Sequence, residues 1–208
     1  MKNILCYGDS NTFGFNSKDN SRYDENTRWT AILQKNLGAE YKVINEGMPN
    51  RTGFVENPDG ILFSSQKHFP EILSKIDSVY ILILAIGTND LMFKYNITFD
   101  TVEEGLNSLI KTAKEKTNNI IIIPPTIMNE NVLKGYFGSM FDKSSIRKSK
   151  EVGKIFKQIA TENNCKYFDI NEFTMPSNID GLHYDEKSHK LIADKLTEFI
   201  FSILTASL

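Results

Sequence analysis

Two hydrophobic periods alternate along the chain. Short runs of β-branched and aliphatic side chains predict five buried strands, at residues 3–7, 41–45, 78–86, 119–123 and 166–169. Longer segments with an apolar side chain every three or four positions predict helices at 28–37, 69–76, 99–116, 143–163 and 185–204. This alternation favours a doubly wound α/β domain around a parallel sheet.

Three connections between these elements are too long to be simple turns. They span residues 9–27, 47–68 and 124–142, and each follows a predicted strand. Long connections in compact domains are usually functional or disordered. In open α/β sheets the ligand crevice lies beyond the carboxyl ends of the strands. We therefore expect the functional site where these connections gather.

Composition places few further limits. The length of 208 residues fits one domain over the whole chain, and 40% hydrophobic with 24% charged residues excludes a disordered chain. A total of 24 Lys and Arg against 26 Asp and Glu gives a net charge of −2. A nucleic-acid partner is therefore not expected, because non-specific binding to phosphates needs a basic field.

Targeting and redox signals are weak. No apolar run is long enough to span a bilayer, and the first apolar segment is too short for a signal peptide. Cys6 and Cys165 are too few for a disulfide framework, which favours two free thiols. These features predict a cytoplasmic protein without a membrane span.

The first predicted strand ends in Gly8-Asp9-Ser10, which places a serine on a tight turn at the expected crevice. Ser10 is therefore a candidate nucleophile. An alternative is that Asp9 or Ser10 only caps a helix at a strand–helix junction. A phosphate-binding loop is a third reading, although neither common glycine-rich phosphate motif is present.

A serine nucleophile needs a base, and the chain has three histidines. His183 follows Asp180 by three residues, with a glycine between them. This spacing lets the carboxylate fold back onto the imidazole, leaving the other ring nitrogen for a serine. An alternative is that Asp180 caps the last helix beside an exposed His183. His189 is expected to be a surface or packing histidine, and His68 has no acidic partner near it in sequence.

Acyl transfer also needs hydrogen-bond donors for the developing oxyanion. Asn89 follows the most apolar strand and would point its amide into the crevice. Gly47 follows the second strand and would leave its N–H open. Each could instead be an ordinary turn residue. A serine, a bare N–H, an amide and an Asp–His pair at successive strand ends would rarely arise from turns alone.

These segments resemble the four sequence blocks of the SGNH hydrolases, also called GDSL esterases. The blocks are Gly8-Asp9-Ser10, Gly47, Gly87-Thr88-Asn89-Asp90 and Asp180-Gly181-Leu182-His183. The resemblance implies a flavodoxin-like, three-layer α/β/α sandwich with a five-stranded parallel sheet. It implies Ser10 as nucleophile, His183 as base and Asp180 as the partner of His183. It also implies an oxyanion hole made by the N–H groups of Ser10 and Gly47 and the side chain of Asn89.

One position departs from the family pattern, because Asn11 stands where the GDSL signature has leucine. Other segments resemble the arylesterase and acyltransferase branch, which is often oligomeric, so a homo-oligomer is expected. The connection at 129–142 is apolar for a loop and suits a pocket wall or a subunit contact, or else packs locally. We assign to substrate binding Asn11, Phe15, Tyr136 and Phe137.

The combined reading is a serine esterase that hydrolyses, or transfers the acyl group of, small short-chain esters such as acetyl esters. The chemistry requires no metal or organic cofactor, and the partner is a small-molecule ester. Two alternatives remain. A thioesterase or lysophospholipase would use the same triad, and a non-catalytic ligand-binding module could share the fold.

Overall fold

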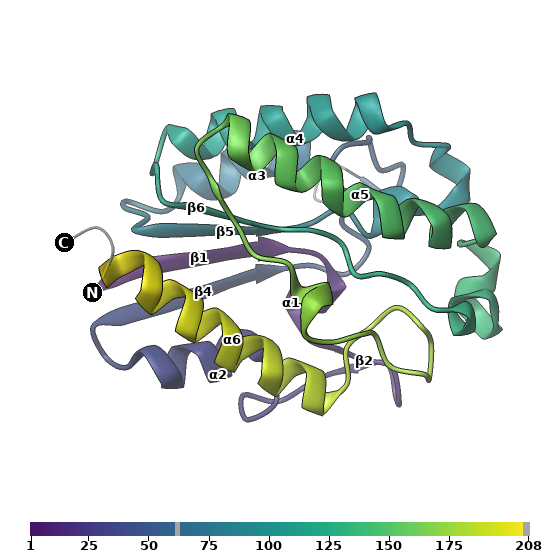
Figure 1. Cartoon of the computed structure of the whole chain (residues 1–208), viewed down its shortest axis with the longest axis horizontal. Coiled ribbons are helices and arrows are strands. Elements are labelled where there is room, and N and C mark those ends of the chain that lie inside the picture. The colour runs from purple at the N-terminus through teal and green to yellow at the C-terminus, as the bar shows by residue number, and fades with distance from the viewer. Residues whose placement is uncertain (61–62, 206–208) are drawn as a thin grey trace.

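Five parallel strands form the central sheet of the structure, a computed structural model that describes residues 1–60 and 63–205. The strand order is β4-β1-β5-β6-β7, and the carboxyl ends of the strands point to one side (Figure 1). The strands are β1 (Lys2–Gly8), β4 (Tyr41–Gly47), β5 (Ile81–Ala85), β6 (Ile120–Ile123) and β7 (Lys166–Tyr167).

Helices cover both faces of this sheet (Figure 1). One face carries α2 (Trp29–Leu37) and α6 (Glu186–Thr205). The other carries α3 (Ser65–Ser74), α4 (Phe99–Lys114) and α5 (Lys143–Glu162). The result is the three-layer α/β/α sandwich that the resemblance implied.

Strand periodicity explains why both faces are covered. Successive side chains of a strand point to opposite faces. In β5, Leu82 and Leu84 join the core under α3, α4 and α5, whereas Ile81 and Ile83 join the core under α2 and α6. All four side chains are fully buried. A continuous apolar run therefore marks a strand buried on both sides, as expected from the sequence.

The boundaries of most elements differ from the prediction by at most two residues. Two elements differ more. Helix α3 begins at Ser65 rather than at residue 69, because both the N–H and the hydroxyl of Ser65 donate to the carbonyl of Thr52, at 3.0 and 2.6 Å. Strand β5 is shorter than the apolar run at 78–86, because β1 pairs with it only over Ile4–Gly8.

The connections between the predicted elements contain short elements that the hydrophobic pattern did not predict. They are α1 (Ser10–Phe13), β2 (Phe15–Asn16), β3 (Ser21–Arg22), η2 (Asn89–Leu91), η3 (Phe93–Tyr95), η4 (Glu130–Leu133), η5 (Gly135–Ser139) and η6 (Ile170–Glu172). Each spans only two to five residues, which is too short for a repeating hydrophobic pattern to be recognised. Helix α1 follows the carboxyl end of β1, so the predicted location of the site is occupied by structured segments (Figure 1).

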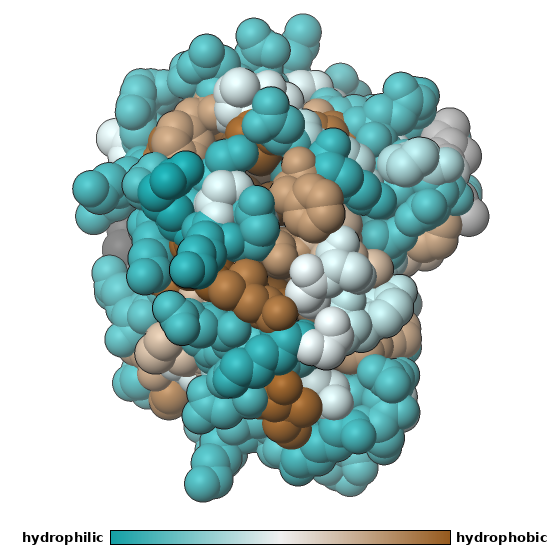
Figure 2. Space-filling model, turned by 90° about the vertical axis from the view of Figure 1, so that its right-hand side faces the viewer, coloured by the Kyte–Doolittle hydropathy of each residue, from teal (hydrophilic) through white to brown (hydrophobic). Residues whose placement is uncertain are grey.

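Within the described ranges, no helix combines the length and apolarity needed to cross a bilayer. Both cysteines are free thiols; Cys6 is buried in the core and Cys165 is partly buried. Figure 2 shows the face at the carboxyl ends of the strands, where apolar surface lies between polar margins.

Candidate active site

Ser10 is placed by the turn that joins β1 to α1. Asp9 is the N-cap of α1, and its carboxylate accepts the N–H of Asn11 at 3.0 Å. Burial raises the pKa of Asp9, while hydrogen bonds from Thr88 and from the Asn11 N–H act in the opposite direction. The helix-capping reading of Asp9 is therefore correct, and it leaves Ser10 at the first helical position, where its side chain is buried.

His183 and Asp180 are brought together by a tight loop before α6. Gly181 adopts a φ of 69°, in the left-handed region that glycine tolerates, and this turns the chain back on itself. One oxygen of Asp180 accepts the N–H groups of Leu182 and His183, each at 3.0 Å. The other oxygen lies 2.6 Å from Nδ1 of His183. The Asp180 carboxylate thus fixes both the loop and the imidazole.

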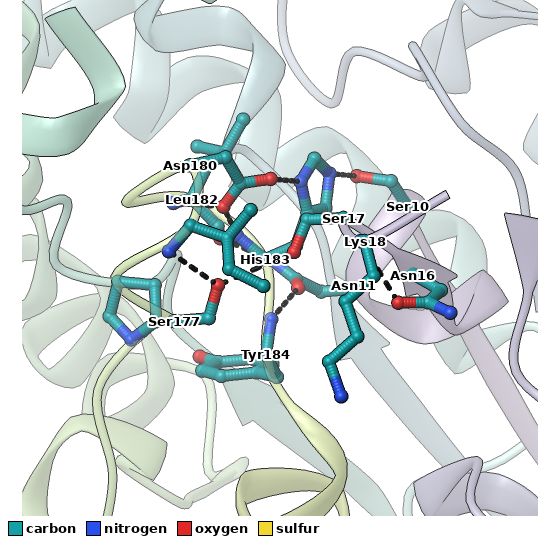
Figure 3. A network of polar contacts seen from close by, with 12 residues as sticks. Ser10, Asn11, Asn16, Ser17, Lys18, Ser177, Asp180, Leu182, His183 and Tyr184 are labelled. Carbon is teal, nitrogen blue, oxygen red and sulfur yellow. Dashed lines mark hydrogen bonds and ion pairs between the residues drawn. The ribbon is translucent and has the colours of Figure 1, made fainter. Parts of the chain in front are cut away.

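The free nitrogen of this imidazole faces the serine. His183 Nε2 lies 2.8 Å from Ser10 Oγ, so Asp180, His183 and Ser10 form one continuous line of hydrogen bonds (Figure 3). Burial alone would raise the pKa of Asp180, but the hydrogen bond and charge of His183 outweigh it and hold that pKa below its usual value. An ionised carboxylate in this position favours a proton on Nδ1, which leaves Nε2 as the acceptor. His183 is buried, not exposed as the alternative reading required.

Asn89 follows β5 on the short helix η2 and is buried. Its Nδ2 donates to the carbonyl of Arg51 at 2.9 Å. A carboxamide nitrogen carries two hydrogens, so one remains for another acceptor. The neighbouring Asp90 accepts the N–H groups of residues 53–55 at 2.7, 2.7 and 3.0 Å, which ties the loop after β4 to η2.

Arg51 was not identified by the sequence reading. Its guanidinium is buried, donates to the carbonyls of Gly8 and Glu46, and lies 4.3 Å from the ring centroid of Tyr7. Burial lowers the pKa of Arg51. The guanidinium therefore links the ends of β1 and β4, and the backbone carbonyl of the same residue accepts the Asn89 amide. Arg51 lies in a segment that resembles the arylesterase branch, but its role could not be predicted from sequence, because its acceptors are backbone carbonyls.

The expectation that the Gly47 N–H is open is wrong. This N–H donates to Oδ1 of Asn45 at 2.8 Å. The Asn45 amide is fixed in this orientation, because its Nδ2 donates to the Thr12 carbonyl at 2.8 Å and to the Thr30 hydroxyl at 2.7 Å. The glycine serves close packing instead, since a Cβ there would lie 2.1 Å from the backbone nitrogen of Phe13.

The residues assigned to substrate binding take different positions. The rings of Phe15 and Phe137 lie 4.4 and 5.3 Å from the imidazole of His183, measured between centroids. Tyr136 is 72% exposed and packs edge-on against Phe137. The amide of Asn11 is hydrogen-bonded to the backbone of the loop that carries His183.

The two other histidines lie outside this hydrogen-bonded line. His189 is fully buried in α6 and accepts the N–H of Trp29 through Nδ1 at 3.3 Å, so it is a packing histidine. His68 is buried within α3, and burial lowers its pKa. In the described ranges, no group of three or more His, Cys, Asp or Glu side chains is arranged to hold a metal ion.

The sandwich, with a serine at the end of β1 and an Asp–His pair before α6, defines the class of flavodoxin-like carboxylic ester hydrolases. The GDSL-like lipase/acylhydrolase family matches residues 4–196, and the chain belongs to this family.

Solved structures of the same fold match over nearly the whole chain. An aryl esterase from M. smegmatis is 22% identical with a TM-score of 0.88, covering 97% of this chain and 99% of that one. A carbohydrate acetylesterase from Sinorhizobium meliloti is 22% identical with a TM-score of 0.89, covering 98% and 100%. A carbohydrate acetylesterase family member from the same organism is 25% identical with a TM-score of 0.87, covering 99% and 100%. No curated protein sequence matches this chain.

Proposed function

We propose that the protein is a serine esterase for small, short-chain carboxylic esters such as acetyl esters. The observation that carries this proposal is the line from Asp180 Oδ2 through His183 to Ser10 Oγ, with links of 2.6 and 2.8 Å. Nucleophile, base and the group that orients the base are the three parts that this chemistry needs. A module that only binds a ligand has no use for such an alignment.

The reaction proceeds in two halves. Ser10 Oγ attacks the ester carbonyl while His183 Nε2 takes the hydroxyl proton, and the carbonyl oxygen becomes an oxyanion. The oxyanion accepts from the Ser10 N–H and from the second amide hydrogen of Asn89. Collapse breaks the ester bond, and His183 returns the proton to the departing alkoxide. Water then attacks the acyl-serine with His183 again as base, releasing the carboxylic acid and the free serine hydroxyl.

The two oxyanion donors are supported by their hydrogen bonding. Among the described residues, the Ser10 N–H makes no other hydrogen bond. Asn89 uses one amide hydrogen on the Arg51 carbonyl, and that bond holds the amide in place. We do not assign the Gly47 N–H to the hole, because Asn45 already accepts it.

Small acyl groups are favoured by the surroundings of His183. The rings of Phe15 and Phe137 crowd the imidazole from the segments after α1 and within η5. Two solved relatives are called an aryl esterase and a carbohydrate acetylesterase, which agrees with acetyl esters of aromatic alcohols or sugars as substrates. Transfer of the acyl group to another alcohol would follow from the same acyl-enzyme. A cytoplasmic location and a homo-oligomer remain predictions.

The experiment is a hydrolysis screen of p-nitrophenyl esters, from acetate to dodecanoate, with the wild type and two serine variants. Ser10→Ala should fold normally and lose roughly 10⁴–10⁶-fold in kcat. Ser17→Ala is the matched control, because its hydroxyl lies nearby and contacts Ser177 Oγ at 3.3 Å. Ser17→Ala should keep its activity. Activity of Ser10→Ala within tenfold of the wild type would refute the proposal.

A further inference from the structure

The side chain of Asn11 bridges helix α1 and the loop that carries His183. Its Nδ2 donates to the carbonyl of Leu182 at 3.2 Å, and its Oδ1 accepts the N–H of Tyr184 at 3.2 Å. These two backbone groups lie immediately before and after His183, and Figure 3 shows Asn11 beside them. A carboxamide offers a donor and an acceptor at once, whereas the leucine of the GDSL signature offers neither.

Asn11 is itself held in place. Its N–H donates to the Asp9 carboxylate at 3.0 Å, and its carbonyl accepts the indole N–H of Trp29 at 3.1 Å. The side chain is buried, so its two contacts to the loop are shielded from competing water. Because Ser10 precedes Asn11 directly, any movement of this residue also moves the nucleophile.

Other hydrogen bonds also hold this loop, but their partners lie outside α1. The N–H of Asn129 donates to the carbonyl of Gly181 at 3.1 Å, and the N–H of Ser177 donates to the carbonyl of His183 at 2.7 Å. In the part of the chain that the structure describes, Asn11 is the one residue of α1 other than Ser10 that is hydrogen-bonded to the loop at 180–184. Apart from the Ser10–His183 contact itself, the amide of Asn11 is therefore the hydrogen-bonded link between α1 and this loop among the described residues.

We propose that Asn11 is a positioning residue that sets the distance and alignment between Ser10 Oγ and His183 Nε2. The inference rests on the proposed function, because it gives the Ser10–His183 contact a catalytic meaning. It replaces the earlier assignment of Asn11 to substrate binding. Small misalignments of a base and its nucleophile lower kcat steeply, so loss of both contacts should cost roughly 10- to 100-fold in kcat.

The first test compares Asn11→Leu with Asn171→Leu. Asn171 is a matched control, because its amide also clamps a loop: Nδ2 donates to the Pro125 carbonyl at 3.1 Å and Oδ1 accepts the Ile127 N–H at 2.8 Å. Both variants lose one donated and one accepted hydrogen bond to a loop backbone, and Asn171→Leu also loses the bond from Nδ2 to Asp169 Oδ1 at 2.9 Å. Only Asn11→Leu loses its bonds beside His183. With p-nitrophenyl acetate, Asn11→Leu should lower kcat with KM within about threefold, and Asn171→Leu should keep kcat.

A spectroscopic readout separates positioning from general destabilisation. The proton between His183 Nδ1 and Asp180 Oδ2 should give a downfield ¹H resonance, because the two atoms lie 2.6 Å apart. Asn11→Leu should shift or broaden this resonance, and Asn171→Leu should leave it in place. A kcat of Asn11→Leu within twofold of the wild type, or a change in KM alone, would overturn the proposal.

If Asn11→Leu does not fold, the variant Asn11→Asp tests the positioning role instead. An ionised carboxyl still accepts the Tyr184 N–H but offers no proton to the Leu182 carbonyl, whereas its protonated form offers both groups. The titratable side chains nearest to this position are Asp9, which accepts the Asn11 N–H, and His183, which lies between the two backbone groups that Asn11 binds. The kcat of Asn11→Asp relative to the wild type should rise as pH falls from about 8 to about 5.5, since acid restores the missing donor. A ratio that does not change with pH would refute the positioning role.

The two proposals fail in different ways. If Ser10→Ala keeps its activity, the proposed function is wrong and Asn11 has no catalytic contact to position. If Ser10→Ala is inactive while Asn11→Leu keeps both kcat and the downfield resonance, the esterase proposal stands and only the role of Asn11 is refuted.

Discussion

Asn45 Oδ1 accepts the N–H of Gly47 at 2.8 Å, and this hydrogen bond determines the structural role of the glycine. The N–H is already used inside the protein, so the residue matters for its missing side chain. The first turn of α1 passes directly over it, and a Cβ at this position would lie 2.1 Å from the Phe13 nitrogen and 2.5 Å from the Thr12 carbonyl carbon. Both of these atoms belong to the backbone and cannot move away by a rotamer change.

Gly47→Ala should therefore lower both stability and activity. The overlap with α1 should cost about 1–3 kcal/mol or more of the free energy of unfolding, and kcat should fall because α1 carries Ser10. Chemical unfolding and kcat with p-nitrophenyl acetate measure the two effects. Gly153→Ala is the control: it lies within α5, where the nearest atom to the added Cβ is Tyr167 Oη at 3.4 Å. An unaltered unfolding midpoint in Gly47→Ala would contradict this packing role.

Asn89→Ala should lower kcat by roughly 10²–10³-fold and change KM little, because an oxyanion exists only near the transition state. The control is Asn57→Ala, which removes a partly buried bond from Asn57 Nδ2 to the Asn50 carbonyl at 2.7 Å and the bond from the Asp59 N–H to Asn57 Oδ1 at 2.9 Å. That variant should lose stability and keep kcat. If Asn89→Ala instead raised KM at constant kcat, Asn89 would bind the substrate rather than the oxyanion.

Asp180→Asn should reduce kcat by about 10⁴-fold while the protein stays folded. The ionised carboxylate accepts the Nδ1 proton of His183, and an amide can present a hydrogen to that nitrogen and favour the wrong tautomer. Asp185→Asn is the comparison, because Asp185 accepts the Ser188 N–H at 2.8 Å near the start of α6. It should alter stability by about 1 kcal/mol and leave kcat unchanged. Equal kcat losses in both variants would argue against the triad.

The sequence predicted the sheet well because its three central strands, β1, β5 and β6, lie in continuous or nearly continuous apolar runs. It also predicted that His183 faces Ser10, and His183 Nε2 lies 2.8 Å from Ser10 Oγ, since loops that follow parallel strands meet at one edge of the sheet. Contacts between particular side chains and backbone groups could not be predicted from the sequence. The partner of the Gly47 N–H depends on the Asn45 rotamer, and the role of Asn11 depends on a loop 171 positions away. Neither pairing leaves a periodic or motif signal.

His189 should make the protein less stable in acid. The imidazole is fully buried, and its Nδ1 accepts the Trp29 N–H at the start of α2. Burial lowers the pKa of His189 to about 4; Asp185 and Glu186 oppose this shift, while His183 and Arg28 add to it. An unfolded histidine titrates near pH 6.5. Between about pH 6.5 and pH 4 the unfolded chain therefore binds a proton that the folded protein does not.

The free energy of unfolding should accordingly fall as pH drops through this window, by up to about 3 kcal/mol from this one residue. Above about pH 6.5 the residue should contribute no pH dependence. His189→Gln removes the titration and keeps an oxygen that can accept the Trp29 N–H. Urea unfolding of both proteins at about pH 7.5 and pH 4.5 measures the effect, and the difference between the two pH-induced changes cancels every other titrating group. We expect the variant to lose less stability on acidification than the wild type. Equal losses in the two proteins would mean that His189 is protonated in the folded state at its ordinary pKa.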